Sequence, residues 1–161
     1  MFGFCFSLVV SIRTMRIVNE IISLKTAATL DFIDITDKIQ AILKKVKIRQ
    51  GIVNIQSLHT TMAVVVNENE PLLIGDMKKT LERIASKKER YQHDDFTIRT
   101  VNMCDGECRN GHSHCKAICL ATSQLINILD NQLQLGQWQR VFAIELDRAR
   151  PRRVSLQIIG E

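Results

Sequence analysis

The chain has 161 residues, of which 45% are hydrophobic and 24% are charged, and this is the composition of one ordinary globular domain. Its longest apolar run, from Phe4 to Val10, is interrupted by Ser7 and is far shorter than the roughly 20 residues that span a bilayer. The sequence therefore excludes an integral membrane protein, and we expect no membrane partner.

The net charge and the cysteines indicate which partners and which cellular compartment to expect. The net charge is +5, but the chain has only six Phe, one Tyr and one Trp, and no aromatic residues interleave with the basic ones. The basic residues of segments 38–49 and 78–90 are typical of solvated helix faces, so a nucleic-acid partner is not expected. Five cysteines, four of them crowded between Cys104 and Cys119, do not form an evenly spaced disulfide framework, which favours a reducing, cytoplasmic location.

The first half of the chain predicts alternating strands and helices. Residues 1–15 lack the basic start and the cleavage site of a signal peptide, so we expect an extension ahead of one domain, residues 16–161. Short β-branched runs predict strands at 17–24 and 31–35. Thr36 is expected to cap a helix, because Ile39, Leu43 and Val46 recur at helical spacing after it.

The next strands should include a central one. Segments 51–58 and 62–67 are rich in Val and Ile, and the run 62–66 is apolar at every position, as in a strand that is buried on both faces. Pro71 is expected to start an amphipathic helix that runs to about Ser86. Segment 98–101 is expected to form one more strand.

The last third of the chain predicts further strands. We expect a strand at 112–122, in which alternation would place His112 and His114 on one face. A hairpin should follow at 125–135, with Asp130 and Asn131 at its turn because both tolerate positive φ. Two final strands are expected at 141–146 and 154–159, separated by a basic loop, 148–153. These elements predict an α+β domain with a mixed or antiparallel sheet and two main helices.

One stretch of sixteen residues concentrates metal-ligating side chains, namely Cys104, Cys108, His112, His114, Cys115 and Cys119. A structural zinc site would use the four cysteines, whereas a catalytic site would use the two histidines and a distant third one. The three-residue spacing within each cysteine pair is wider than usual, so we expect Cys104, Cys115 and Cys119 to be plain buried hydrophobic residues.

The remaining candidate residues lie beside the other histidines and at element ends. His59 precedes two threonines, and His93 precedes two aspartates, so all four histidines adjoin polar residues and favour one shared pocket. Glu68 and Asp76 are candidates to orient a histidine or to accept a proton, although a strand end and a helix start also favour such carboxylates. The sequence contains no phosphate-binding glycine loop, dinucleotide fingerprint or serine-hydrolase elbow.

Four strings, taken together, resemble the YjbQ family: HTTMAVVVNENEP (59–71), YQHDD (91–95), NGHSH (110–114) and LQLGQWQRVFAIELDRARPRR (133–153). The resemblance covers about residues 17–161. It implies a compact α+β domain that assembles as a homotrimer, with a metal ion in a pocket formed by the motif histidines. The functional positions that it implies are His59, Thr60, Asn67, Glu68, Asp76, His93, Asn110, His112 and His114.

Members of that family are described as secondary thiamine-phosphate synthases, which join a pyrimidine diphosphate to a thiazole phosphate and release pyrophosphate. The resemblance therefore implies a metal-binding enzyme that acts on small phosphorylated metabolites. His93, His112 and His114 are the expected ligands of a divalent ion, which could be Zn, Mn, Fe, Ni or Mg.

The expected catalytic and positioning residues of this enzyme are Glu68, Asp76, His59, Thr60 and Asn67. His59 is also a possible fourth ligand of the ion. The arginines of 148–153 are candidates for anion contacts, or they form a solvated loop. The alternatives are a metal-dependent hydrolase of a phosphorylated or acyl metabolite, and a ligand-binding trimer without catalysis.

Overall fold

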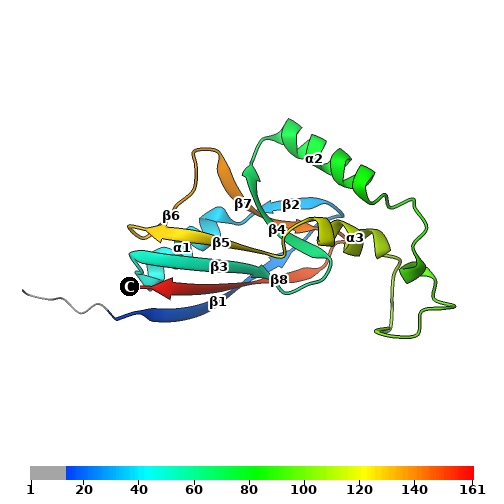
Figure 1. Ribbon diagram of the computed structural model, residues 1–161, viewed down its shortest axis with the longest axis horizontal. Coiled ribbons are helices and arrows are strands. Elements are labelled where there is room, and N and C mark those ends of the chain that lie inside the picture. Colours follow the sequence, from blue (N-terminus) through cyan, green and yellow to red (C-terminus); the bar gives the residue numbers. More distant parts are fainter. Residues whose placement is uncertain (1–13) are drawn as a thin grey trace, which may run out of the picture.

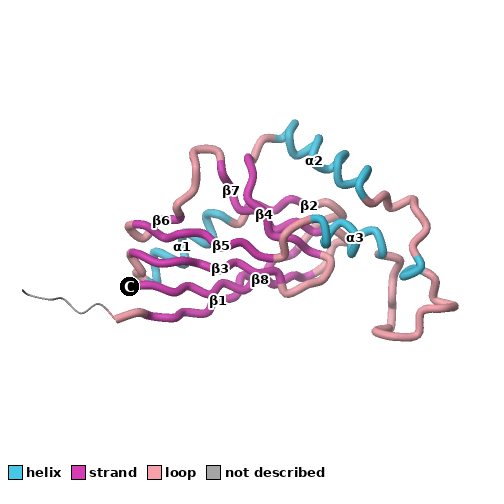
Figure 2. The backbone as a smooth tube through the Cα atoms, viewed as in Figure 1, coloured by secondary structure: helices cyan, strands magenta, loops and turns pink. Residues whose placement is uncertain are grey.

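A computed structural model describes residues 14–161, so residues 1–13 of the expected extension lie outside the described residues. Two antiparallel sheets form the body of the molecule, and helices pack against them (Figures 1 and 2). No helix within 14–161 is long and apolar enough to cross a membrane. The elements in chain order are β1 (Arg16–Lys25), β2 (Asp31–Asp34), α1 (Thr36–Val46), β3 (Gln50–Ser57), β4 (Met62–Glu68), α2 (Pro71–Ile84), the short 3₁₀ helix η1 (Gln92–Asp94), α3 (Gly111–Cys119), β5 (Ser123–Leu129), β6 (Gln132–Leu133), β7 (Gln139–Glu145) and β8 (Pro151–Gly160).

The larger sheet has five strands in the order β1-β8-β3-β5-β6, and the smaller has three in the order β2-β7-β4. Each pairing of neighbouring strands is antiparallel. The expected α+β class is therefore confirmed, but residues 14–161 contain three α-helices where we expected two main ones.

Two apolar cores explain the uninterrupted apolar run of β4. Met62 and Val64 point into a core between the two sheets and α1, while Ala63 points into a second core beneath α2 and α3. The prediction that β4 is buried on both faces is thus confirmed at these positions. It is not a central strand, however, because it forms the edge of the smaller sheet. That edge is protected at Val64, whose N–H donates to the carbonyl of Ala121 at 3.0 Å.

The starts of α1 and α2 use different caps. Thr36 is the first residue of α1 rather than its cap, and its hydroxyl donates to Asp34 Oδ1 and accepts the N–H of Val141. The carboxylate of Glu70 caps α2 by accepting the N–H groups of Leu72 and Leu73. Pro71 follows as the first helical residue, as predicted.

The C-terminal strands also agree with the prediction in most respects. Asp130 and Asn131 have φ of 50° and 62°, which confirms the expected turn between β5 and β6. Strand β8 begins at Pro151, so Arg152 and Arg153 belong to a strand and not to the expected basic loop. The expected strand at 98–101 is wrong, because these residues form turns and loop.

The expected strand at 112–122 is also wrong, because residues 111–119 form α3. His112, Ser113, Lys116 and Ala117 are the buried residues that follow its first position, and this spacing is that of one helical face rather than of a strand. This helix lies beside β4, at the end of the sheets where η1 and its long following loop are found (Figure 1).

Candidate functional site

A pocket of about 540 Å³ lies where the β3–β4 turn, the loop after η1, helix α3 and the start of β8 meet. It is lined by three of the four histidines, His59, His93 and His114, although these residues are far apart in the sequence. Its volume is in the range that accommodates a small metabolite. The expectation of a shared histidine pocket therefore holds for these three side chains.

His59 is fixed in the β3–β4 turn by hydrogen bonds on both sides of the residue. Its backbone N–H donates to Ser57 Oγ at 3.2 Å, and its ring Nε2 accepts the backbone N–H of Arg153 at 2.8 Å. A neutral ring held in this way carries its proton on Nδ1, which is then a donor. Burial, followed by the charges of Arg152 and Arg153, lowers the pKa of His59 and favours this neutral form.

His93 and His114 form an aromatic pair in the pocket wall. Their ring centroids are 4.7 Å apart at an interplanar angle of 60°. Burial, and then the neighbouring His93 and Arg99, lower the pKa of His114. The Nε2 atom of His93 is buried without a hydrogen-bond partner. The pair thus supplies a ring nitrogen, Nε2 of His93, that the protein itself leaves without a hydrogen bond.

His112 points away from this pocket, which corrects its expected place beside His114. Side chains two residues apart diverge by about 200° around a helix, whereas a strand would have aligned them. His112 is 2% exposed, and its Nδ1 lies 3.2 Å from the Nζ of the buried Lys116. Lys116 in turn pairs with Glu82 of α2 at 2.8 Å. His112 therefore belongs to the contact between α3 and α2.

The environment of His112 also keeps its ring neutral. Burial, and then the positive charge of Lys116, lower the pKa of His112. A neutral imidazole can accept the hydrogen bond that the buried ammonium of Lys116 donates. This arrangement explains the burial of a lysine and a histidine side by side.

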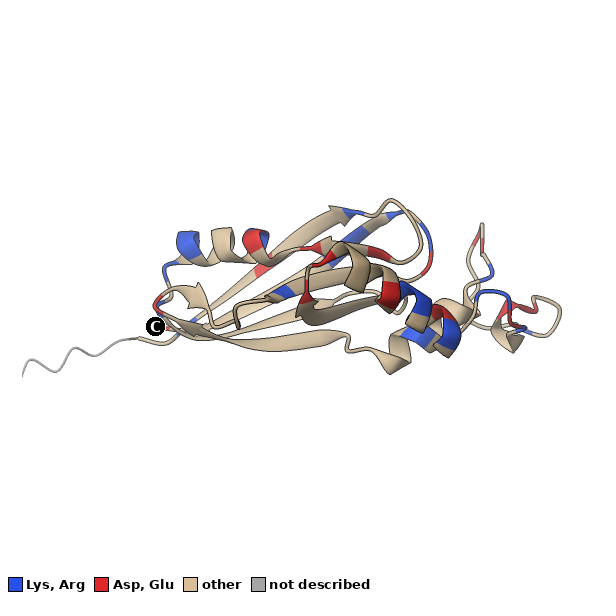
Figure 3. Cartoon of the chain, turned by 90° about the horizontal axis from the view of Figure 1, so that it is seen from above, with Lys and Arg blue, Asp and Glu red and all other residues tan. Residues whose placement is uncertain are grey.

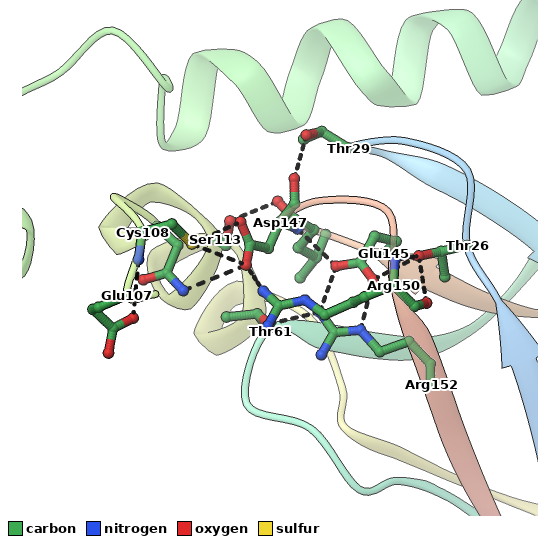
Figure 4. A network of polar contacts seen from close by, with 12 residues as sticks. Thr26, Thr29, Thr61, Glu107, Cys108, Ser113, Glu145, Asp147, Arg150 and Arg152 are labelled. Carbon is green, nitrogen blue, oxygen red and sulfur yellow. Dashed lines mark hydrogen bonds and ion pairs between the residues drawn. The ribbon is translucent and has the colours of Figure 1, made fainter. Parts of the chain in front are cut away.

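A network of charged and polar side chains adjoins the pocket (Figure 4). Arg152 and Glu145, which are 3% and 0% exposed, form two hydrogen bonds of 2.5 and 2.6 Å. The hydroxyl of Thr61 accepts a further hydrogen bond from Arg152 at 2.8 Å. This bidentate geometry, with its remaining partners supplied, allows the ion pair to be buried.

The second ion pair of this network reaches the pocket surface. Arg150 pairs with Asp147, and the guanidinium side chain of Arg150 remains 31% exposed. Arg99, which also lines the pocket, pairs with Glu107 at 3.3 Å. The Arg150 side chain is therefore more exposed than that of Arg99, which is 11% exposed, although the Nε and Nη2 atoms of Arg150 are themselves buried.

Sequence reasoning missed Glu145, Asp147, Arg99 and Glu107 as parts of the site. Glu145 had a detectable signal, because it is a charged residue within the apolar run of β7. Arg99 and Glu107 had none, since they lie in a loop whose course depends on tertiary contacts.

The other expected site residues lie in three places. Thr60 lines the pocket, and so does Asn110, which is 7% exposed at the start of α3. Asn67 and Glu68 end β4, where the amide of Asn67 contacts Met77 Sδ at 3.4 Å. Asp76 lies on the exposed face of α2 and pairs with Lys79 at 3.1 Å. Asn67, Glu68 and Asp76 therefore do not line this pocket of their own chain.

Residues 14–161 do not bring together a complete set of metal ligands. A catalytic zinc ion takes three protein ligands and a water molecule. Within 14–161 no three His, Cys, Asp or Glu side chains are gathered closely enough to hold one ion. The His93–His114 pair offers two nitrogen donors, and His112, which we expected as the third ligand, faces elsewhere.

The cysteines are not the buried hydrophobic residues that we expected. Cys104, Cys115 and Cys119 are exposed, and Cys108 is partly buried with its Sγ 3.8 Å from a carboxylate oxygen of Asp147. All four are free thiols. They take no part in the histidine pairing of the pocket.

Comparison with known proteins places the chain in a family. Residues 20–161 match the family model described as UPF0047 protein YjbQ-like. A UPF0047 protein of Methanothermobacter thermautotrophicus is 33% identical over 147 residues, which cover 91% of this chain and 95% of that protein. One from Archaeoglobus fulgidus is 33% identical over 86% of this chain and 98% of its own length.

A solved structure agrees with this result. The crystal structure of a YbjQ-like protein from Sulfolobus solfataricus superposes with a TM-score of 0.82 at 29% sequence identity, covering 92% of this chain and all of that one. The chain therefore belongs to the UPF0047 family of YjbQ-like proteins.

Proposed function

We propose that the protein is an enzyme that binds a small phosphorylated metabolite in the pocket of His59, His93 and His114. The observation that carries this proposal is the convergence of three imidazole rings and the Arg150 guanidinium on one pocket. A guanidinium and an imidazole N–H are donors suited to phosphate oxygens. The lowered pKa values of His59 and His114 favour neutral rings, which can accept or donate a proton.

The reaction we propose to test first joins a pyrimidine diphosphate to a thiazole phosphate. The thiazole nitrogen supplies the electron pair for the new C–N bond, and the C–O bond to the diphosphate breaks as pyrophosphate leaves. Such a reaction needs groups that orient two substrates and stabilise the charge that develops on the leaving group. Arg150 and the Nδ1–H of His59 are the chain's own candidates for that stabilisation.

The test is formation of thiamine phosphate, measured by fluorescence after oxidation to a thiochrome. We expect His114→Gln to lose a factor of about 10² or more in kcat, the scale of a group that positions the reacting atoms. His112→Gln is the matched control on the other side of α3 and should stay within about threefold once its folding is verified. Absence of product with wild-type protein would contradict the reaction.

Measurements of binding, together with turnover, distinguish an enzyme from a ligand-binding protein. Calorimetry with inorganic pyrophosphate should detect binding to wild-type protein and weaker binding to Arg150→Met. Tight pyrophosphate binding without turnover of the pyrimidine diphosphate and thiazole phosphate would favour a non-catalytic ligand-binding protein.

A divalent ion is part of the proposal at the His93–His114 pair. The unpartnered Nε2 of His93 supports this placement, and an ion there would help to neutralise a bound phosphate. Elemental analysis of purified protein should find the ion in wild type and His112→Gln but not in His93→Ala/His114→Ala. The same unpartnered nitrogen favours hydrolysis of a phosphate ester as the second candidate, which a panel of esters assayed with and without chelator would detect.

We further propose that the protein is a cytoplasmic homotrimer whose subunits meet through the outer face of the larger sheet. Charged residues at the outward positions of β1, β3, β5 and β8 are confined to one end, at Lys25 and Arg153. The rest of the face is apolar or carries uncharged polar groups, and the long strands are largely tan in Figure 3. Ile17 and Leu125 on this face are 65% and 64% exposed.

Light scattering during size-exclusion chromatography tests this assembly. Wild-type protein should have the mass of three chains, and Leu125→Glu should reduce it to one, because a charge would be buried in the interface. Leu72→Glu is the matched control, since Leu72 is 79% exposed on α2, away from this sheet face. A monomeric wild type would refute the trimer. The free thiols support the reducing, cytoplasmic location.

A further inference from the structure

The short helix η1 lies against the first turn of α3, and the two elements touch at three successive points. Tyr91, just before η1, packs on Gly111, while Asp94 binds the backbone at the start of α3, and His93 contacts His114. These contacts join a segment that is otherwise loop to the helix that carries one wall of the pocket. These three contacts, which we call the η1–α3 joint, therefore form part of the pocket wall.

Asp94 performs the capping that the local sequence of α3 does not. Its Oδ1 accepts the backbone N–H of Asn110 at 2.9 Å and that of Gly111 at 2.8 Å. Asn110 occupies the position at which an asparagine usually caps a helix, but its side chain makes no capping hydrogen bond. A carboxylate from sixteen residues earlier in the chain has taken this role.

Gly111 makes the close approach possible. A Cβ atom at this position would lie 2.5 Å from Cβ of Tyr91 and 2.8 Å from its Cγ, which is too close for any side chain. Tyr91 is itself fixed, because its hydroxyl donates to the carbonyl of Ser86 at 2.8 Å. A larger residue at 111 would therefore push η1 away from α3.

The joint determines the distance between the two histidines. His93 directly precedes Asp94, and His114 lies three residues after Gly111, which is one turn further along the same side of α3. The hydrogen bonds that hold Asp94 at the start of α3 therefore also hold the ring of His93 against that of His114. We propose that Asp94 and Gly111 are positioning residues that keep His93 against His114, an inference that rests on the proposed function for its catalytic consequence.

The closing experiment uses Asp94→Ala in the full chain, with Asp95→Ala as the matched control. The Asp95 carboxylate accepts hydrogen bonds from Thr97 and pairs with Arg90, so it does not touch α3. In Asp94→Ala, the amides of Asn110 and Gly111 should exchange with solvent at least about tenfold faster, and the nuclear Overhauser effect between the rings of His93 and His114 should disappear. Both signals should be unchanged in Asp95→Ala.

Kinetics distinguish positioning from mere support of the fold. Displacement of one catalytic group should lower kcat for thiamine phosphate by about tenfold or more, while KM stays within about threefold because Arg150 is untouched. Asp94→Asn keeps an oxygen that can accept both N–H groups, so it should restore most of the kcat and the ring contact. Gly111→Ala should reproduce the loss.

The outcomes separate the two proposals. Persistence of the ring contact in Asp94→Ala would overturn the inference, whatever the activity. Loss of the contact without a fall in kcat would overturn the positioning role. Wild-type protein that shows the contact and its dependence on Asp94, but makes no thiamine phosphate, would refute the proposed reaction and leave the joint established.

Discussion

The two sheets and the segment between α2 and α3 owe their structure to different kinds of interaction. In the sheets, each strand is fixed by a ladder of backbone hydrogen bonds and by side chains in one of two apolar cores. In the segment, Ile98 and Val101 are 61% and 68% exposed, and single polar contacts fix the chain. The sheets therefore determine stability, while the precision of the pocket depends on a few individual groups.

The largest effect should come from removing Arg152, whose partner Glu145 belongs to the sheet side of this comparison. Arg152→Met leaves Glu145 buried and uncompensated, which should lower the free energy of unfolding by about 3–5 kcal/mol. Arg153→Met is the matched control, because Arg153 is the next residue of β8 and is exposed; it should change stability by less than about 1 kcal/mol. Urea denaturation of both variants measures the difference, and equal losses would break the comparison.

A smaller effect should separate the two sides of α3. His112→Ala leaves the buried Lys116 without one of its partners, so we expect a loss of about 1–3 kcal/mol in unfolding free energy. His114→Ala removes a ring that lines the pocket, so it should lower the unfolding free energy less than His112→Ala does and lower the activity more. Denaturation and the thiamine phosphate assay, applied to both variants, test whether His112→Ala mainly lowers stability and His114→Ala mainly lowers activity. A more stable His112→Ala than His114→Ala would contradict it.

The smallest effect concerns acid pH and Asp34, which joins β2 to α1 and β7. Burial by itself would raise the pKa of Asp34, but hydrogen bonds from Arg140 and Thr36, together with the charge of Arg140, outweigh burial and hold the pKa below its ordinary value. The unfolded chain therefore binds a proton first as the pH falls. The stabilisation is complete above the ordinary carboxyl range and is lost below it, as the pH falls through the lowered pKa.

Thermal unfolding between pH 7 and pH 3 measures this contribution. Asp34→Asn should be less stable than wild type at pH 7, and the difference should shrink toward pH 3. Asp76→Asn, at an exposed carboxylate on α2, is the control and should show little difference at either pH. A constant difference for Asp34→Asn across the range would show that its charge is not the cause.

The sheet side of the molecule could largely be predicted from sequence, and the reason is physical. Strands such as β8 alternate buried and exposed residues, so period two reveals them, and Asp130–Asn131 reveals its turn through a backbone preference. Helix α3 could not be predicted in the same way. Its apolar residues suit either period, and its cap comes from Asp94, which no local pattern links to it.

The candidate site was predictable in its residue types and less so in its grouping. The family motifs indicated four histidines, and three of them line one pocket, but the wrong secondary structure at 112–122 placed His112 with them. The carboxylates behind the pocket, Glu145 and Asp147, were missed because their importance arises from arginines that fold against them. The grouping of these residues depends on contacts between segments that are distant in the sequence, which a local pattern does not reveal.

The occupied start of α3 has a consequence for how a phosphate would be recognised. The free N–H groups of a helix start usually attract anions, but here the Asp94 carboxylate already accepts two of them. A bound phosphate must instead rely on the charged side chains that line the pocket. Interactions of that kind weaken as ionic strength rises, so affinity for such ligands should depend strongly on salt concentration.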